Sequence, residues 1–313
     1  MDLERFCATS RVVIVAGKGG VGKTTVTAAL SVAAARAGLS VLIVEVEGKS
    51  GLAECFAHEP LDYEEALLRP GIRARTLTPD DALVEYLEDH GLRRISRRLA
   101  QSGALEVVAT AVPGMKDILV LGKVKQLEKV GAADLIIIDA PAAGHAISFL
   151  MSARGLLDAV HVGPVQKQAA DVVELLTDPQ RCQVMLVTHP EETPVNELVE
   201  TAFAVEDHAG VALGPVVVNG FVPPIPDLHA GRVATSDDPW SRDADTVTLA
   251  RAATVRVELE ARQHAQCERL AQQLPLPQIR LPYLFTADVG PDEIDTLADA
   301  FTLGVRALDA DAR

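Results

Sequence analysis

The sequence has few of the residues that build membrane, disulfide-linked or nucleic-acid-binding proteins. Its 313 residues include only 4 cysteines and 4 methionines, and 29 Lys and Arg stand against 44 Asp and Glu. No uninterrupted apolar run reaches the roughly 18 residues that cross a bilayer. The first residues, MDLERFCATSR, lack the basic and apolar pattern of a signal peptide. We therefore expect a cytoplasmic protein without stable membrane insertion.

These shortages also narrow the class of ligand. A formal net charge of −15 argues against the binding of nucleic acid, because contacts to phosphate backbones need Lys and Arg. The cysteines are widely spaced with no CxxC pair, so neither a zinc clamp nor a disulfide framework is indicated. Small molecules and proteins remain as the expected partners. Burial as reduced thiols is expected of all four cysteines, Cys7, Cys55, Cys182 and Cys267.

Short apolar runs rich in β-branched residues dominate what is present. They alternate with helical patterns, and continuous runs of this kind suit strands that are buried on both faces of a parallel sheet. The predicted class is therefore α/β, with a doubly wound and mostly parallel sheet, and we expect residues 1–313 to form one domain. The predicted strands occupy residues 11–17, 40–47, 133–141, 158–164, 183–190, 215–220 and 277–283.

Two segments interrupt this alternation, at about residues 80–130 and 224–274, and we expect them to form a small helical subdomain. The first carries an apolar stripe that either packs on the protein's own sheet or forms a groove for a partner. The second begins with a stretch rich in Pro, Asp and Ser and continues as a helix over about 246–274. The stripe consists of Leu87, Gly91, Ile95 and Leu99, opposite several arginines.

The stretch AGKGGVGKTT at residues 16–25 lies between the first predicted strand and a helical pattern. It meets the phosphate-loop pattern GxxxxGKS/T. Glycines let the backbone turn its amides inward, so that they surround a β-phosphate at the start of a helix. The pattern predicts a nucleotide site formed by Gly17, Gly19, Gly20, Val21, Gly22, Lys23, Thr24 and Thr25.

Side chains in and near this loop have separate predicted roles. We expect Lys23 to bridge the β- and γ-phosphates, Thr24 to bind Mg²⁺ through its hydroxyl, and Thr25 to reach the α-phosphate. Asp139 ends a strongly apolar strand, where a carboxylate is needed to orient a water molecule on the metal. The expected ligands are ATP or ADP with Mg²⁺, and Thr24 and Asp139 form the metal side of the site.

A second lysine, Lys18, distinguishes this loop from an ordinary one. The run GKGGVGKTT resembles the deviant phosphate loop of the SIMIBI ATPases, which include the MinD, ParA, nitrogenase iron protein and ArsA families. In those families the first lysine projects across a dimer interface to the phosphates that the other subunit binds. The resemblance implies a P-loop NTPase that dimerises, with Lys18 stabilising charge on its partner's γ-phosphoryl group.

Further segments are similar to those of the ArsA family, which includes arsenite-pump ATPases and the eukaryotic ATPase that targets tail-anchored membrane proteins. LIIIDAPAAGHAISFL at residues 135–150 resembles the family's switch II segment, and VTHPEETPVNE at 187–197 resembles another of its segments. The resemblance implies that Asn219 reads adenine, and that Pro282 and Tyr283 belong to a loop that covers the base. It spans nearly the whole chain.

Switch I departs from the family pattern. The family has DPAH after the second strand, with the aspartate positioning the attacking water, whereas this chain has VEVEGKSGLAECF and places Glu47 there. The extra methylene moves the carboxylate by roughly an ångström, which predicts slow hydrolysis. Alternatively, Lys49 holds Glu47 as a structural carboxylate. The stretch EVEG resembles an actinobacterial ArsA-like branch with paired dissimilar subunits, so the dimer is either homomeric or heteromeric.

The clients of known relatives fit this chain poorly. An arsenite site needs converging thiolates, and Cys55 is a lone thiol beside switch I. A targeting factor for tail-anchored proteins needs a methionine-rich groove, and there are only 4 methionines. Three functions remain open: a slowly hydrolysing Mg²⁺–ATP-dependent dimeric switch, a nucleotide-binding scaffold subunit with little turnover, and a chaperone or targeting protein that binds a client in residues 80–130.

Overall fold

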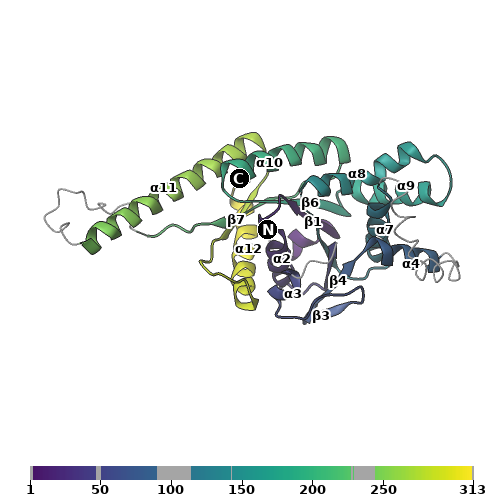
Figure 1. Ribbon diagram of the computed structural model, residues 1–313, viewed down its shortest axis with the longest axis horizontal. Coiled ribbons are helices and arrows are strands. Elements are labelled where there is room, and N and C mark those ends of the chain that lie inside the picture. Colours follow the sequence, from purple (N-terminus) through teal and green to yellow (C-terminus); the bar gives the residue numbers. More distant parts are fainter. Residues whose placement is uncertain are drawn as a thin grey trace.

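An eight-stranded sheet forms the centre of the computed structural model, in the order β3-β4-β2-β5-β1-β6-β7-β8 (Figure 1). Neighbouring strands are parallel except β3 and β4, which are antiparallel. The structure describes residues 3–46, 51–89, 114–141, 143–226, 228 and 244–311. The strands are β1 (Val12–Gly17), β2 (Val41–Val46), β3 (Ala66–Arg69), β4 (Ile72–Leu77), β5 (Leu135–Asp139), β6 (Cys182–Thr188), β7 (Val216–Phe221) and β8 (Gln278–Pro282).

Helices cover both faces of this sheet. One face is covered by α7, α8, α9, α10 and α11, and the other by α1, α2, α3 and α12. The helices are α1 (Leu3–Cys7), α2 (Lys23–Arg36), α3 (Gly51–Cys55), α4 (Pro79–Asp89), α7 (Met115–Lys129), α8 (Ala143–Ala159), α9 (Pro164–Thr177), α10 (Glu192–Phe203), the π-helix η1 (Ala204–Ala209), α11 (Ala244–Gln273) and α12 (Pro291–Asp311).

Alternate residues of the central strands belong to two separate cores. In β1, Val12 and Ile14 pack in the core beneath α7 to α11, whereas Val13 and Val15 pack in the core beneath α2 and α12. A strand that is buried on both faces needs apolar residues at every position, which explains the unbroken run VVIV. The doubly wound, mostly parallel α/β fold that the sequence predicts is confirmed.

The predicted strand positions are wrong at two places. Residues 158–164 form the end of α8 and the link to α9 rather than a strand, and Val162 is 82% exposed. The apolar residues of this run therefore do not enter the sheet. Conversely, β3 and β4 are missing from the predicted set, because arginines interrupt their apolar pattern: the strands read ALLR and IRARTL.

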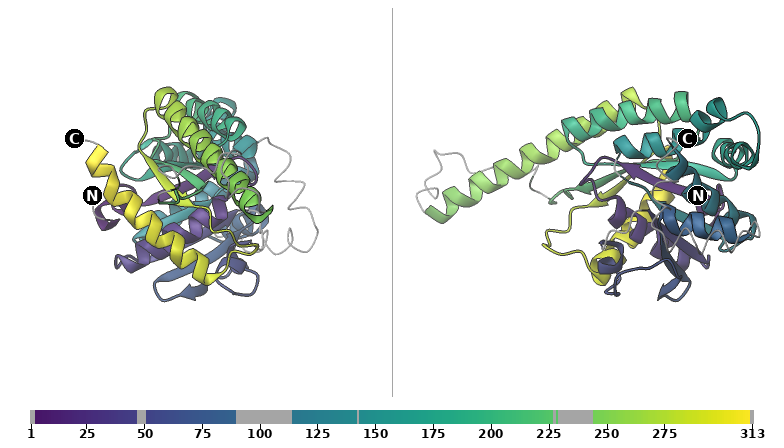
Figure 2. Two further views of the ribbon diagram at one scale, coloured as in Figure 1. Left: turned by 90° about the vertical axis from the view of Figure 1, so that its left-hand side faces the viewer. Right: turned by 45° about the vertical axis from the view of Figure 1, so that its right-hand side comes forward.

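The two predicted helical segments are described in part. The first contains α4 and α7, but residues 90–113, with most of its apolar stripe, lie outside the described residues. The second contains α11, a helix of 30 residues that reaches far out from the sheet (Figures 1 and 2). The single domain and the helical subdomain stay predictions. Within the described residues, no helix combines the length and apolar character that a membrane span requires.

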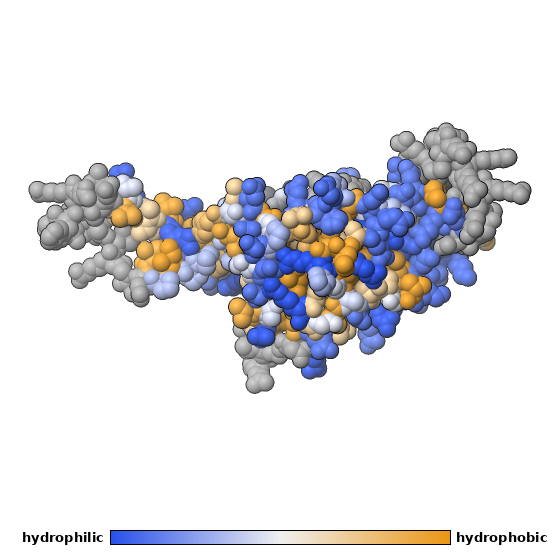
Figure 3. Space-filling model, turned by 90° about the horizontal axis from the view of Figure 1, so that it is seen from below, coloured by the Kyte–Doolittle hydropathy of each residue, from blue (hydrophilic) through white to orange (hydrophobic). Residues whose placement is uncertain are grey.

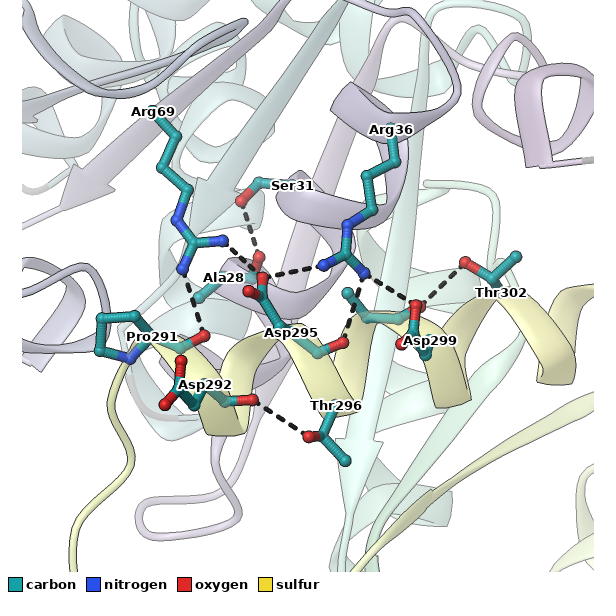
Figure 4. Close-up of polar contacts among 11 residues, drawn as sticks. Ala28, Ser31, Arg36, Arg69, Pro291, Asp292, Asp295, Thr296, Asp299 and Thr302 are labelled. Carbon is teal, nitrogen blue, oxygen red and sulfur yellow. Dashed lines mark hydrogen bonds and ion pairs between the residues drawn. The ribbon is translucent and has the colours of Figure 1, made fainter.

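One carboxylate fastens the last helix to the helix of the phosphate loop. Figure 4 shows Asp295 of α12 between Arg36, at the end of α2, and Arg69, at the end of β3. Arg36 lies 3.0 Å from Asp295 and 2.8 Å from Asp299. Arg69 also donates to the carbonyl oxygen of Pro291 at 3.2 Å. A network of charges, rather than one ion pair, thus fixes the far end of α2.

Replacing Asp295 should destabilise the fold more than replacing its neighbour in this network. Asp295→Ala removes contacts to two arginines and should lower the free energy of unfolding by about 1–2 kcal/mol. Asp299→Ala is the matched control: Asp299 lies one turn later, is 75% exposed and pairs with Arg36. Asp299→Ala should lower the free energy of unfolding, measured by urea denaturation, by less than about 0.5 kcal/mol. Equal losses for the two variants would contradict this role of Asp295.

Candidate nucleotide-binding site

The phosphate loop joins β1 to α2 at the edge where the parallel strands end. Its glycines are required by the local geometry, as well as by the motif. Gly20 and Gly22 have φ angles of +86° and +87°, which side-chain-bearing residues rarely adopt. A Cβ atom at Gly17 would lie 2.4 Å from the carbonyl oxygen of Val187. The first N–H groups of α2 have no acceptor inside the helix, so they are available to an anion at this edge.

A cavity of about 300 Å³ opens at this loop. Its lining comes from the loop, the start of α2 and the ends of β2 and β5. Lys23 is buried, and its Nζ donates to the carbonyl oxygen of Lys18 at 3.1 Å, so the amine is held across the loop. Thr25 follows in the first turn of α2. The lining residues are Gly19, Gly20, Gly22, Lys23, Thr24, Val46, Asp139 and Ala140.

Thr24 and Asp139 meet at this cavity, as the sequence predicts for a metal site. The Thr24 hydroxyl donates to Asp139 Oδ2 at 2.6 Å. Oxygen donors suit Mg²⁺, which takes few protein ligands and fills its remaining positions with water and phosphate oxygens. Within the described parts of the chain, no group of three or more His, Cys, Asp or Glu side chains could hold a metal ion. The Thr24 hydroxyl and the Asp139 carboxylate would suit a metal ion that takes its other ligands from phosphate and water.

The second lysine of the loop pairs within its own chain. Lys18 Nζ forms an ion pair with Glu197 of α10, and the Lys18 side chain is 53% exposed. No motif in the sequence points to Glu197 as a partner, because the two residues are 179 positions apart. Lys18 therefore lies at the open edge of the site, where an acidic side chain of the same subunit holds it.

Asn219 contacts the phosphate loop from β7, which β6 separates from β1 in the sheet. Its Nδ2 donates to the carbonyl oxygen of Val21 at 3.0 Å. A residue absent from the predicted set, His189, links the same parts: its Nδ1 lies 3.0 Å from the carbonyl oxygen of Asn219, and its Nε2 lies 3.2 Å from that of Gly20. The position predicted to read adenine is thus in direct contact with the loop predicted to hold phosphate.

Pro282 and Tyr283 lie beside this strand. Pro282 is in register with Phe221, whose carbonyl oxygen accepts a hydrogen bond from the Tyr283 N–H at 2.9 Å. The Tyr283 ring contacts Phe285 edge to face, with centroids 4.8 Å apart. Tyr283 also adjoins Gly220, since a Cβ there would lie 3.7 Å from its ring. The predicted base-covering loop is therefore next to Asn219.

Of two carboxylates near switch I, Glu47 and Glu45, the structure describes only Glu45. Glu47, the predicted water-positioning residue, lies outside the described residues, as does Lys49. Glu45, which the sequence did not single out, is buried at 2% exposure on β2, in register with Asp139. It accepts a hydrogen bond from the Thr76 hydroxyl at 3.0 Å. Successive side chains of a strand point to opposite faces of the sheet, and both faces are buried here. A glutamate between two valines of a predicted strand could therefore have indicated a buried carboxylate.

Cys55, whose thiol feels the charge of Asp139, lies in an environment that disfavours its thiolate. Burial raises the pKa of the Cys55 thiol to about 11, and the charge of Asp139 adds to the shift. The thiol therefore stays protonated at neutral pH, whereas a soft metal or metalloid binds the thiolate. All four cysteines are free and buried, in agreement with the sequence-based expectation.

Comparison with known proteins finds a family model and several relatives that match part of the chain. Residues 10–163 match the model of a family described as anion-transporting ATPase, ArsA ATPase. The ATPase BagA of Mycobacterium tuberculosis is 37% identical over 227 residues, which are 68% of this chain and 66% of that protein. The chain thus matches slightly less than two thirds of the length of its mycobacterial relatives.

More distant relatives share shorter or weaker similarity. A putative arsenical pump-driving ATPase of Halobacterium salinarum is 26% identical over 68% of this chain and 36% of its own length. The ATPase get3 of Schizosaccharomyces japonicus is 30% identical over 44% of this chain and 42% of its own length. All of these relatives carry the name ATPase, and each similarity extends over part of both chains.

The contact between Gly22 and Asn219 can be tested by adding one methyl group. A Cβ at Gly22 would lie 2.2 Å from Asn219 Nδ2, at a φ angle that disfavours alanine. Gly22→Ala should therefore lower the free energy of unfolding by about 2–3 kcal/mol without nucleotide. Urea denaturation measures the loss.

Gly19→Ala is the matched control for this effect, because a Cβ at Gly19 meets nothing within 4 Å. The free energy of unfolding of this control should fall by less than about 1 kcal/mol. Combining Gly22→Ala with Asn219→Ala should recover part of the Gly22→Ala loss, because the clashing amide is gone. Strict additivity of the two substitutions would contradict the close approach.

Proposed function

We propose that this chain, which belongs to the ArsA family of ATPases, binds Mg²⁺–ATP at the β1–α2 loop and hydrolyses it as a dimeric switch. The observation that carries the proposal is the 2.6 Å contact of Thr24 with Asp139 at the mouth of the loop cavity. It brings a hydroxyl and a carboxylate to the place where a phosphate-bound metal would sit. A phosphate loop with both metal-side residues assembled is built for nucleotide chemistry.

Different groups of the chain bind the phosphates, the metal and the adenine of the nucleotide. The loop amides and the start of α2 take the phosphate oxygens, and the buried Lys23 ammonium reaches the β- and γ-phosphates. Thr24 and Asp139 would hold Mg²⁺, which neutralises phosphate charge when it is bound. Asn219 and the loop of Pro282 and Tyr283 receive the adenine. His189 keeps the adenine strand and the phosphate loop in register, through its two carbonyl contacts.

Dimerisation gives Lys18 a second partner. The half-exposed side chain can leave Glu197 and reach the phosphates in a facing subunit, where an added cation stabilises charge on the transferring phosphoryl group. The ion pair within the chain competes with that arrangement. Formation of the dimer therefore exchanges one carboxylate partner for a phosphate partner. The facing subunit is a second copy of the chain or a dissimilar ArsA-like subunit.

Glu47 decides between a slow ATPase and a scaffold subunit. If its carboxylate orients the attacking water, Glu47→Gln should lower the steady-state rate of phosphate release by about 10-fold or more. ATP affinity, measured by calorimetry, should change less than about twofold, because the water is not a binding contact. Equal rates in variant and parent would assign Glu47 a structural role and favour the scaffold.

The exchange of partners by Lys18 is tested at Glu197. Glu197→Gln removes a surface ion pair that favours the monomer, so the dissociation constant of the ATP-bound dimer should fall about two- to fivefold. Analytical ultracentrifugation with a non-hydrolysable ATP analogue measures it. Glu200→Gln, on the exposed face one turn later in α10, is the control.

A second comparison isolates the lysine itself. In a Lys18→Ala background the ion pair is already gone, so Glu197→Gln should leave the dissociation constant of the dimer unchanged. An effect of Glu197→Gln that persists without Lys18 would show that the carboxylate acts on the dimer by some other route.

A further inference from the structure

Arg256 connects the outward-reaching helix α11 to the loop that follows β8. Its Nη2 group donates to the carbonyl oxygen of Pro223, which lies just after β7. Its guanidinium also lies over the ring of Phe285, with Cζ 5.4 Å from the ring centroid. Its Nε pairs with Glu260, one turn later in the helix, at 3.1 Å. One side chain thus joins α11 to the loops after β7 and β8.

These contacts matter because apolar packing does not hold this part of α11. Among residues 248–262, Glu260 alone is buried, and it is the partner of Arg256. Figure 3 shows apolar groups uncovered on the projecting part of the molecule, and Leu249 and Val255 are more than half exposed. A buried carboxylate needs a charged or hydrogen-bonded partner, so Glu260 keeps the Arg256 guanidinium in place. Polar contacts, rather than a core, thus set the position of this guanidinium.

Phe285 has a backbone conformation that an aromatic residue rarely adopts. Its φ angle is +54°, in the left-handed region. Such a residue stays there only when its surroundings fix it. Two contacts act on its ring: the Arg256 guanidinium lies over it, and the Tyr283 ring packs edge to face with centroids 4.8 Å apart. Arg256 therefore helps to fix the part of the loop that contains Tyr283.

A short series of contacts leads from this loop to the phosphate loop. Tyr283 adjoins Gly220, at which a Cβ atom would lie 3.7 Å from the Tyr283 ring and 3.1 Å from His189 Nδ1. His189 Nε2 in turn lies 3.2 Å from the carbonyl oxygen of Gly20. The Tyr283 side chain is 48% exposed. In the proposed function the base of the nucleotide lies on this side of the phosphate loop, where an aromatic ring offers a stacking surface.

We propose that Arg256 is a positioning residue for the base of ATP: it holds Phe285, and through it Tyr283, in the arrangement that covers adenine. The proposal rests on the proposed function, because it takes Tyr283 as a residue that receives adenine. A loop that is fixed before binding loses less conformational entropy when the nucleotide arrives, so the affinity for ATP rises without a new contact. A planar guanidinium stacks on a ring and donates hydrogen bonds at the same time, which an ammonium group does less well.

Arg256→Lys tests this role, because lysine keeps a cation beside Glu260 and lacks the planar group that lies over Phe285. Calorimetry compares the binding of two ligands with Mg²⁺: ATP, and inorganic tripolyphosphate, which has the phosphates and no base. We expect ATP binding to weaken about three- to tenfold and tripolyphosphate binding to change less than about twofold. Arg262→Lys is the matched control, since Arg262 pairs with Glu258 one turn earlier in the same helix. This control should bind both ligands as the parent does.

Each other result overturns a specific claim. Equal weakening of ATP and tripolyphosphate binding would show that Arg256 supports the phosphate loop or the whole fold, and would overturn its role at the base. Unchanged ATP binding would make its contacts structural only, with the same consequence. An equal effect of Arg262→Lys would overturn a role specific to Arg256. A parent chain that binds neither ligand would overturn the proposed function itself, and the positioning role with it.

A second variant tests whether Arg256 acts through Phe285. Phe285→Leu keeps an apolar side chain and removes the aromatic face, so it should also weaken ATP binding about three- to tenfold. Adding Arg256→Lys to Phe285→Leu should weaken ATP binding less than about twofold further, because the contact is already lost. In steady-state hydrolysis each variant should raise KM for ATP and leave kcat within about twofold. Fully additive losses, or a lower kcat with unchanged KM, would overturn the route through Phe285.

Discussion

The contact of Thr24 with Asp139 is the constraint on which the rest of the site depends. It requires the start of α2 and the end of β5 to meet within hydrogen-bond distance. The parallel sheet makes this possible, because β1 and β5 are neighbours and both end at the same edge. Buried apolar residues on both faces of these strands hold the sheet between two layers of helices. The chemistry at the edge thus follows from the packing of the interior.

The sequence predicts what local patterns determine, and misses what tertiary contacts determine. The run before the loop predicts β1, and the spacing of Gly17, Gly22 and Lys23 predicts the phosphate site, because each requirement involves neighbouring residues. Glu197 and His189 reach the loop from segments more than 160 positions away, so no spacing rule could reveal them. The apolar patterns that predict strands also miss β3 and β4, because a strand near the sheet's edge tolerates arginines.

Several of the binding groups described above lie along one edge of the sheet. The loop cavity, the half-exposed Lys18 and the aromatic pair of Tyr283 and Phe285 lie at the ends of the parallel strands. A protein organised in this way concentrates charge, aromatic surface and apolar surface where a second molecule can contact all three. In the proposed function, nucleotide binding and contact with a second subunit therefore share one face.

The last helix has a consequence for how the protein is made. Phe301 of α12 is fully buried, packs edge to face on Phe6 with ring centroids 6.1 Å apart, and belongs to the core that covers α2. Until residues 291–311 have emerged from the ribosome, the side of α2 and the part of the sheet face that α12 covers are exposed. A nascent chain would therefore expose this apolar surface until α12 emerges, which is a period when chaperones are needed. The phosphate-loop helix acquires its native support on this side only when α12 packs against it.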